Sequence, residues 1–422
     1  MGAAAVGLVA LLVFGWGLLS ARLERADLSA PIVFVVAGVL LSEGFRVIEP
    51  ETTHDVIRLL AEVTLVWVLF ADAARVRPRQ LRADAGLYAR LLGVGLPLTI
   101  AAGTLVAVSM FDGLGFWPAL LVGAALAPTD AALGAAVMVD PAVPERVRRV
   151  LNVESGLNDG IATPVVSFAI AGAAVVERVE GAPGLGGAFA ELLIGLATGV
   201  VLGAVGGRAM RTARRRGWAS EEFTGPAVLA LALAAYAVTV ALEGNGFVAA
   251  FVAGLAFGDA AGRGGATEVF YVEQTAGLAS LVTWLLFGAV VVPAVVREAD
   301  WRVLGYAVLS LTVIRMLPVA LALARSGLSG RTVAFVGWFG PRGLASIIFA
   351  VLALEELGEG ADRAVAVIGT TVLLSVFTHG LSAKTLARRY AASLARPAVV
   401  PADGAAPPHL PVRSLVHRRP DA

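Results

Sequence analysis

The sequence has no cysteine and only four histidines in 422 residues. The absence of cysteine excludes disulfide bonds, thiol nucleophiles and cysteine-ligated metals. Two of the histidines, His409 and His417, lie in a polar C-terminal stretch, so a histidine-rich metal site is a poor interpretation of the other two. We therefore expect no resident metal cofactor.

Charged residues are also scarce. They make up 15% of the chain, against 58% hydrophobic residues and 48 glycines, which is typical of polytopic helical membrane proteins and not of soluble ones. The formal net charge of +1 gives no indication of a nucleic-acid partner. We predict an all-α, multi-pass protein of the cell membrane.

Long apolar runs alternate with short charged loops along most of the chain. Runs of roughly 15 to 25 residues are about long enough to cross a bilayer, so the pattern predicts about thirteen transmembrane helices in a domain covering residues 1–390. The expected ranges are 3–20, 29–42, 55–71, 87–110, 116–138, 149–176, 185–207, 223–243, 246–259, 270–296, 301–324, 332–354 and 362–386.

The distribution of Lys and Arg predicts the orientation, because cytoplasmic loops carry the positive excess. With the N-terminus outside, most of the 33 basic residues fall in cytoplasmic loops and the tail. The opposite loops hold Arg46, Arg178, Arg297, Arg302 and Arg363. We therefore expect an outer N-terminus and a cytoplasmic C-terminus, with 391–422 as a disordered tail. Arg22 and Arg25 follow the first apolar run, which is the reverse of a cleaved signal peptide.

A polar, acidic stretch, Glu154-Ser155-Gly156-Leu157-Asn158-Asp159-Gly160, lies within the sixth apolar run. A carboxylate at the bilayer centre costs about 2.5 to 3.5 kcal/mol on insertion scales, so Asp159 is a functional candidate by default. In a helix, residues four apart share a face, which puts Ser155 and Asp159 on one stripe and Glu154 and Asn158 on another. Asp159 can then face an ion pathway while Glu154 pairs elsewhere.

Two proline motifs interrupt other runs: Ala127-Pro128-Thr129-Asp130 in the fifth and Gly340-Pro341-Arg342-Gly343 in the twelfth. Proline removes a helix hydrogen bond, and the freed backbone groups are tolerated in a membrane only beside protein, a cavity or an ion. The motifs are an odd number of segments apart, so equivalent helices would run in opposite directions, as in inverted-repeat transporters. Asp130 and Arg342 supply the opposite charges that two opposed half-helix dipoles require. Ordinary proline kinks are the alternative.

These motifs, together with Arg315, resemble the monovalent cation:proton antiporter-1 family, the sodium/proton exchangers of the NhaP type. The resemblance covers about residues 1 to 390 and implies an NhaA-like antiporter fold of about thirteen helices with inverted repeats, in which the fifth and twelfth helices are broken and cross. It also implies a homodimer. The mobile core would comprise approximately 87–176 and 301–386, and the dimerisation helices approximately 1–71 and 223–296.

The same resemblance implies roles for individual residues. Asp159 would be the ion- and proton-binding carboxylate, with Asn158 as its partner. Thr129, Asp130 and Ser155 would help to form the site for the transported Na+.

Three further residues match charged positions of the family. Glu154 and Arg315 would form a buried charge pair, and Arg342 would supply the charge at the second helix break.

The expected function is exchange of Na+, or Li+, for H+ by alternating access, serving pH and sodium homeostasis. A buried carboxylate can hold a proton or a small hard cation, but not both. With Asn158 neutral and Glu154 paired, one proton exchanges for one cation, so we expect electroneutral transport. The alternatives are K+/H+ exchange and a passive cation channel. Proton-coupled flux distinguishes an antiporter from a channel, because a channel need not move protons against the cation. An intramembrane aspartyl protease would need two carboxylates in contact, and this chain has no Gly-x-Gly-Asp sequence that ends in such a carboxylate. We therefore expect a transporter without a cofactor, and not an enzyme.

Overall fold

The computed structural model describes residues 3–48, 54–76, 84–131, 133–134, 137–138, 140–179, 184–262, 265–298 and 300–394, and within these ranges the chain forms helices and loops without a strand. The expected disordered tail falls almost wholly outside the described residues, which end with a helix that reaches Leu394.

The helices follow one another in the order α1 (Ala3–Arg25), α2 (Ala30–Val39), η1 (Leu40–Gly44), α3 (His54–Arg75), α5 (Ala85–Arg90), η4 (Leu91–Gly95), α6 (Leu96–Met110), α7 (Phe116–Ala125), α9 (Glu145–Val176), α10 (Gly184–Arg215), α11 (Glu221–Ala241), α12 (Gly246–Ala261), α13 (Gly265–Leu286), η6 (Phe287–Val291), α14 (Val292–Glu298), α15 (Trp301–Leu311), α16 (Val313–Ala322), α17 (Gly330–Trp338), α18 (Leu344–Leu357), η7 (Gly358–Ala361) and α19 (Asp362–Leu394).

Every predicted apolar range contains a helix. In the described part of the chain, eight helical stretches are long and apolar enough to cross a membrane, and α2 with η1, α7 and α12 are shorter apolar helices. The predicted all-α membrane fold is thus confirmed. The number of thirteen crossings stays a prediction.

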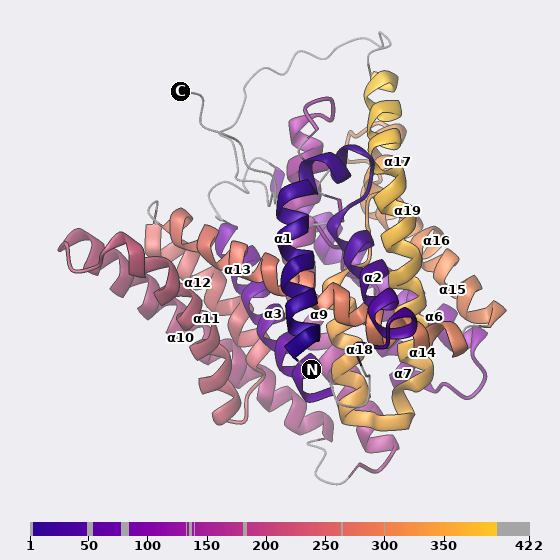
Figure 1. The fold of residues 1–422 in the computed structure, drawn as a ribbon, viewed down its shortest axis with the longest axis horizontal. Coiled ribbons are helices and arrows are strands. Elements are labelled where there is room, and N and C mark those ends of the chain that lie inside the picture. Colours follow the sequence, from indigo (N-terminus) through magenta and orange to yellow (C-terminus); the bar gives the residue numbers. More distant parts are fainter. Residues whose placement is uncertain are drawn as a thin grey trace.

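The helices lie in two groups (Figure 1). In one, α12 packs between α10 and α3, α13 packs against α2 and α3, and α11 contacts α12 and α13. In the other, α6 packs against α7, α15 and α18 pack against α19, and α16 contacts α6 and α17. Helices α3 and α9 lie between α10–α12 and α15–α16 in Figure 1, and they contact each other. The two groups therefore meet along α3, α9 and α18.

Close packing of α10 on α12 depends on a stripe of glycines four residues apart. A Cβ on Gly195, Gly199 or Gly203 would strike the backbone carbonyl of a residue of α12 or its N-cap. Lipid tails are as apolar as leucine, so such close backbone approach, and not the hydrophobic effect, holds membrane helices together.

Both proline motifs end a helix. α7 ends at Ala125, just before Pro128, and α17 ends at Trp338, with α18 beginning only at Leu344. The acidic stretch of the sixth run behaves differently, because α9 continues through it from Glu145 to Val176. The stretch interrupts the apolar run but not the helix.

Candidate functional site

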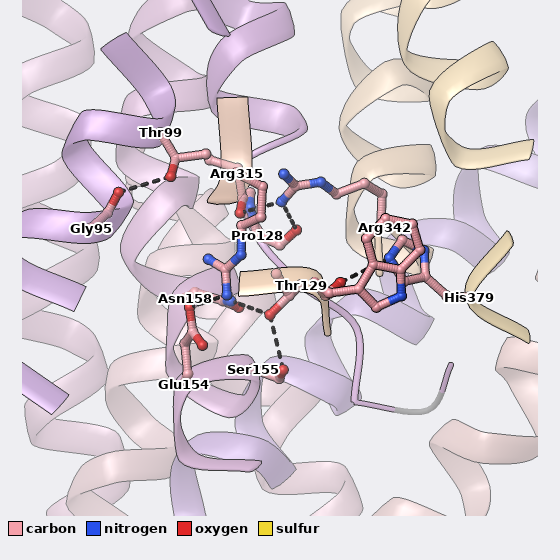
Figure 2. Close-up of polar contacts among 12 residues, drawn as sticks. Gly95, Thr99, Pro128, Thr129, Glu154, Ser155, Asn158, Arg315, Arg342 and His379 are labelled. Carbon is pink, nitrogen blue, oxygen red and sulfur yellow. Dashed lines mark hydrogen bonds and ion pairs between the residues drawn. The ribbon is translucent and has the colours of Figure 1, made fainter. Parts of the chain in front are cut away.

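The two helix breaks cross, and Arg342 of one break binds the backbone of the other. Its Nη1 donates to the carbonyl oxygens of Ala127 at 2.7 Å and Pro128 at 3.1 Å (Figure 2). Its Nη2 donates to the carbonyl of Ser310 at 3.3 Å. The guanidinium, on a residue that is 0% exposed, thus lies at the negative end of the α7 dipole and binds the carbonyls that the break frees.

Asp130 makes the reciprocal contact with the second break. Its backbone N–H donates to the carbonyl of Pro341 at 2.8 Å, and its Oδ2 accepts the N–H of Leu344, the first residue of α18, at 3.1 Å. A Cβ on Gly343 would overlap the carboxylate, so this approach requires glycine there. Each half-helix end therefore meets a side-chain charge of the sign that its dipole requires.

Next to the crossing, three buried polar side chains form a hydrogen-bond network. Asn158 Nδ2 donates to Thr129 Oγ1 at 2.8 Å, and the hydroxyls of Thr129 and Ser155 lie 2.9 Å apart (Figure 2). The network joins the first break to α9. The Asn158 Oδ1 atom is buried and has no hydrogen-bond partner among the described residues.

A buried ion pair lies behind this network. Arg315 Nη2 of α16 is 2.6 Å from Glu154 Oε1 of α9, and the two side chains are 2% and 3% exposed. A Cβ on Gly340 would lie 2.5 Å from Arg315 Nε and 3.1 Å from Thr129 Cγ2. The second break therefore packs directly on the ion pair and on Thr129.

A cavity of about 570 Å³ leads to the other face of α9. Asp159 and Ser155 line it together with Asp130, and Asp159 is 9% exposed. The cavity also contacts the C-terminal end of α1, the loop before α9 and the C-terminal half of α19. The charged residues there are Glu24, Arg25, Asp27, Asp140, Lys384 and Arg388.

The predicted site residues thus fall into three positions. Asp159, Ser155 and Asp130 lie on the cavity wall, Thr129 and Asn158 are hydrogen-bonded behind Ser155, and Glu154, Arg315 and Arg342 bind each other or the crossed backbone. Across the described residues, no group of three or more His, Cys, Asp or Glu side chains could hold one metal ion. An ion here would need hydroxyl, amide, backbone or water oxygens beside its carboxylates.

Asp72 is the residue that sequence reasoning missed. It lies near the end of the third apolar run, is 9% exposed and lines the same cavity as Asp159. It lies against α9 at Gly156, where an added Cβ would be in ordinary van der Waals contact with Asp72 Cβ, at 3.7 Å. Glu62, ten residues earlier on α3, binds Arg58 at 2.9 Å and the hydroxyl of Tyr236 at 3.0 Å.

The chain that carries these helix breaks and buried charges matches the model of a known family. The model of the transmembrane domain of sodium/hydrogen exchangers matches residues 8–389. The chain belongs to the sodium/hydrogen exchanger family. The resemblance seen in the sequence motifs is thereby confirmed, and the family is one of transporters.

Individual relatives differ in the cation that their names give. The K(+)/H(+) antiporter NhaP of Alkalimonas amylolytica is 28% identical over 346 residues, covering 78% of this chain and 57% of that protein. The K(+)/H(+) antiporter NhaP2 of Shewanella baltica is 25% identical, covering 88% and 64%. The Na(+)/H(+) antiporter NhaP of Pseudomonas aeruginosa is 28% identical, covering 86% and 89%. This chain spans less than two thirds of the length of the first two.

The fold also matches a solved structure, that of the sodium proton antiporter MjNhaP1 from Methanocaldococcus jannaschii. The TM-score is 0.73 with 20% sequence identity, and the match covers 92% of this chain and 99% of that one. At this identity the likeness concerns the fold alone.

Proposed function

We propose that this protein is a secondary antiporter that exchanges Na+, or Li+, for H+ by alternating access. The observation that supports it best is the cavity that leads to Asp159 and Ser155 beside the crossed helix breaks. Membership of the sodium/hydrogen exchanger family agrees with this activity.

Competition for Asp159 would couple the two ions. Small hard cations prefer oxygen ligands, and Asp159, Ser155 and Asp130 supply such oxygens at the cavity wall. Asn158 Oδ1, which has no hydrogen-bond partner in the part of the chain that the structure describes, and the hydroxyl of Thr129 supply further oxygens just behind it. The carboxylate holds either the proton or the cation, so a cation moving one way returns a proton the other way.

The charges around the site favour electroneutral exchange. Asn158 is neutral, the Glu154 carboxylate pairs with Arg315, and Arg342 is bound to backbone carbonyls. These groups keep their charge as the core moves, and so would Asp130, which accepts the N–H of Leu344. Asp159 would then be the carboxylate that exchanges one proton for one cation. Asp72, on the same cavity wall, would add to the negative potential that attracts the cation.

We infer that this conformation is open at the end where the cavity lies and closed at the opposite end of α3. The cavity contacts the C-terminal ends of α1 and α19. At the opposite end, Arg58 of α3 lies 3.0 Å from Glu355 of α18, and we name these two residues the far-face ion pair. Arg58 precedes Asp72 by about 21 Å of helix at about 1.5 Å per residue. Transport would require this contact between α3 and α18 to open.

The membrane orientation and the assembly belong to the same proposal. An outer N-terminus makes the open end cytoplasmic, where Arg25, Lys384 and Arg388 follow the positive-inside rule. The group of α6, α7, α9 and α15–α19 would be the mobile core. The group containing α2, α3 and α11–α13 would form the dimer contact in the cell membrane.

K+/H+ exchange is the second candidate, because several relatives carry that name. The oxygens that would bind Na+ also suit K+, so the chemistry of the site does not separate the two cations.

The proposal is tested by reconstituting the purified protein into proteoliposomes that contain a pH-sensitive dye. Addition of Na+, Li+ or K+ in turn, at several pH values, should produce cation-driven proton movement. An imposed membrane potential should leave the rate unchanged. Cation flux without proton movement would support a channel, and a clear voltage dependence would reject one-for-one exchange.

A further inference from the structure

Helix α19 places two buried polar side chains against the second helix break. Ser375 and His379 are 0% and 1% exposed and, four residues apart, share one face of the helix. Ser375 Oγ is 2.7 Å from the backbone nitrogen of Arg342, and His379 Nδ1 is 3.1 Å from Ser375 Oγ. His379 Nε2 is 3.0 Å from the carbonyl oxygen of Trp338, the last residue of α17.

The chemistry of these groups fixes the direction of each hydrogen bond. The N–H of Arg342 can only donate, so Ser375 Oγ accepts it. The carbonyl of Trp338 can only accept, so His379 Nε2 carries the hydrogen. In a neutral imidazole the other nitrogen, Nδ1, is then an acceptor, and the Ser375 hydroxyl donates to it. One tautomer therefore satisfies a continuous chain of bonds from Arg342 to Trp338.

This chain spans the break, because Trp338 ends α17 and Arg342 lies just before α18. We propose that Ser375 and His379 are positioning residues for the ion site, which hold the break at both ends and thereby orient Asp130. We call the two residues the α19 clamp. Figure 2 shows His379 next to Arg342, beside the group that contains Thr129 and Pro128.

The path from the α19 clamp to the cavity consists of three hydrogen bonds. Ser375 holds the N–H of Arg342. The neighbouring carbonyl of Pro341 accepts the N–H of Asp130 at 2.8 Å, and the N–H of Leu344 donates to Asp130 Oδ2 at 3.1 Å. The backbone on both sides of Arg342 thus binds Asp130, whose carboxylate lines the cavity. A shift of this backbone moves the carboxylate.

The inference rests on the proposed function, since it concerns the affinity of that site for its cation. Groups that orient the ligands of an ion typically change its affinity by about 10-fold to 100-fold when they are removed. We therefore expect Ser375→Ala and His379→Ala each to raise the KM for the transported cation by about tenfold, with a smaller change in maximal rate. The double variant should raise KM by less than the product of the single effects, because both residues belong to one chain.

Thr371→Val is the matched control. Thr371 lies one turn before Ser375 on α19, is also 0% exposed, and its hydroxyl donates to Val367 of the same helix at 2.7 Å. The substitution removes a buried hydroxyl of the same helix without disturbing the break. We expect its KM to match that of the wild type, even if its melting temperature falls.

The experiment is a KM and maximal-rate measurement for Na+ and K+ in proteoliposomes, normalised to folded protein. Cation-dependent thermal stabilisation of the detergent-purified protein gives the same affinities without transport. Wild-type exchange tests the proposed function alone, whereas the ratio of variant to wild-type affinity tests the α19 clamp. Unchanged affinity in Ser375→Ala, or an equal loss in Thr371→Val, overturns the inference.

Discussion

Neutralising one member of the buried ion pair should destabilise the protein strongly. Glu154→Gln keeps the shape of the side chain but leaves the Arg315 guanidinium, on a residue that is 1% exposed, without its anion. The paired atoms are 2.6 Å apart, and charge centres about 4 Å apart attract by about 4 kcal/mol at an effective dielectric constant of about 20. Removal of one partner of a buried pair typically costs about 3 to 5 kcal/mol. We expect a loss of stability in this range.

The assay compares apparent melting temperatures of purified Glu154→Gln, Arg315→Gln and the double variant in detergent. Both single variants should melt well below the wild type. The double variant should melt above at least one of them, because it leaves no lone buried charge.

An exposed pair provides the control. Arg297 Nη2 lies 2.9 Å from Glu43 Oε1 with side chains that are 71% and 53% exposed, and we name these two residues the reference ion pair. Exposed pairs contribute about 0 to 1 kcal/mol, so Glu43→Gln should scarcely change the melting temperature. Two results would contradict the prediction: Glu154→Gln melts no lower than Glu43→Gln, or the decrease in melting temperature of the double variant equals the sum of the two single decreases. Either result would mean that Glu154 and Arg315 do not stabilise each other.

Three further predictions concern transport. The Asp159→Asn variant should insert and fold normally but should not exchange ions. If it retains even about a tenth of the wild-type rate in proteoliposomes, the exchange site lies elsewhere, with Asp130 as the next candidate. Gly343→Ala should reduce exchange severely, because the new Cβ would overlap the Asp130 carboxylate. Gly330→Ala is the control, because a Cβ there has open space around it, and it should leave exchange unchanged. Equal exchange rates of the two variants in dye-loaded vesicles would contradict this prediction. Cysteines in place of the far-face ion pair, joined by a reducible crosslinker, should stop exchange until they are reduced. Cysteines crosslinked in place of the reference ion pair should leave the exchange rate unchanged. If exchange continues when the far-face positions are crosslinked, α3 and α18 need not separate during transport.

Local sequence patterns predicted the helices well. Apolar runs separated by charged loops have one stable form in a bilayer, where each backbone group must bond within its own helix. The helix breaks could also be predicted from the sequence. Pro128 and Pro341 remove helix hydrogen bonds, and the charges of Asp130 and Arg342 have the signs that the dipoles of the half-helix ends require.

Contacts between distant segments were less accessible to sequence reasoning. Asp72 lies near the end of an apolar run, where nothing local indicates an ion site, because the cavity that reaches it is formed by several helices. Ser375 and His379 gave no signal of their own, since a serine and a histidine four residues apart on an apolar helix are usually satisfied within that helix. Their partners on the second break became visible only from the packing of α19 against it.

The crossing of the two breaks also bears on how the chain is made. The carbonyls of Ala127 and Pro128 receive their donor from Arg342, which is synthesised more than 200 residues later. During that interval the end of α7 has to keep water or another provisional partner, since an unsatisfied carbonyl is costly in lipid. The first half of the chain therefore enters the bilayer before these hydrogen bonds can form. They form only after the segment between α17 and α18, which carries Arg342, has left the ribosome.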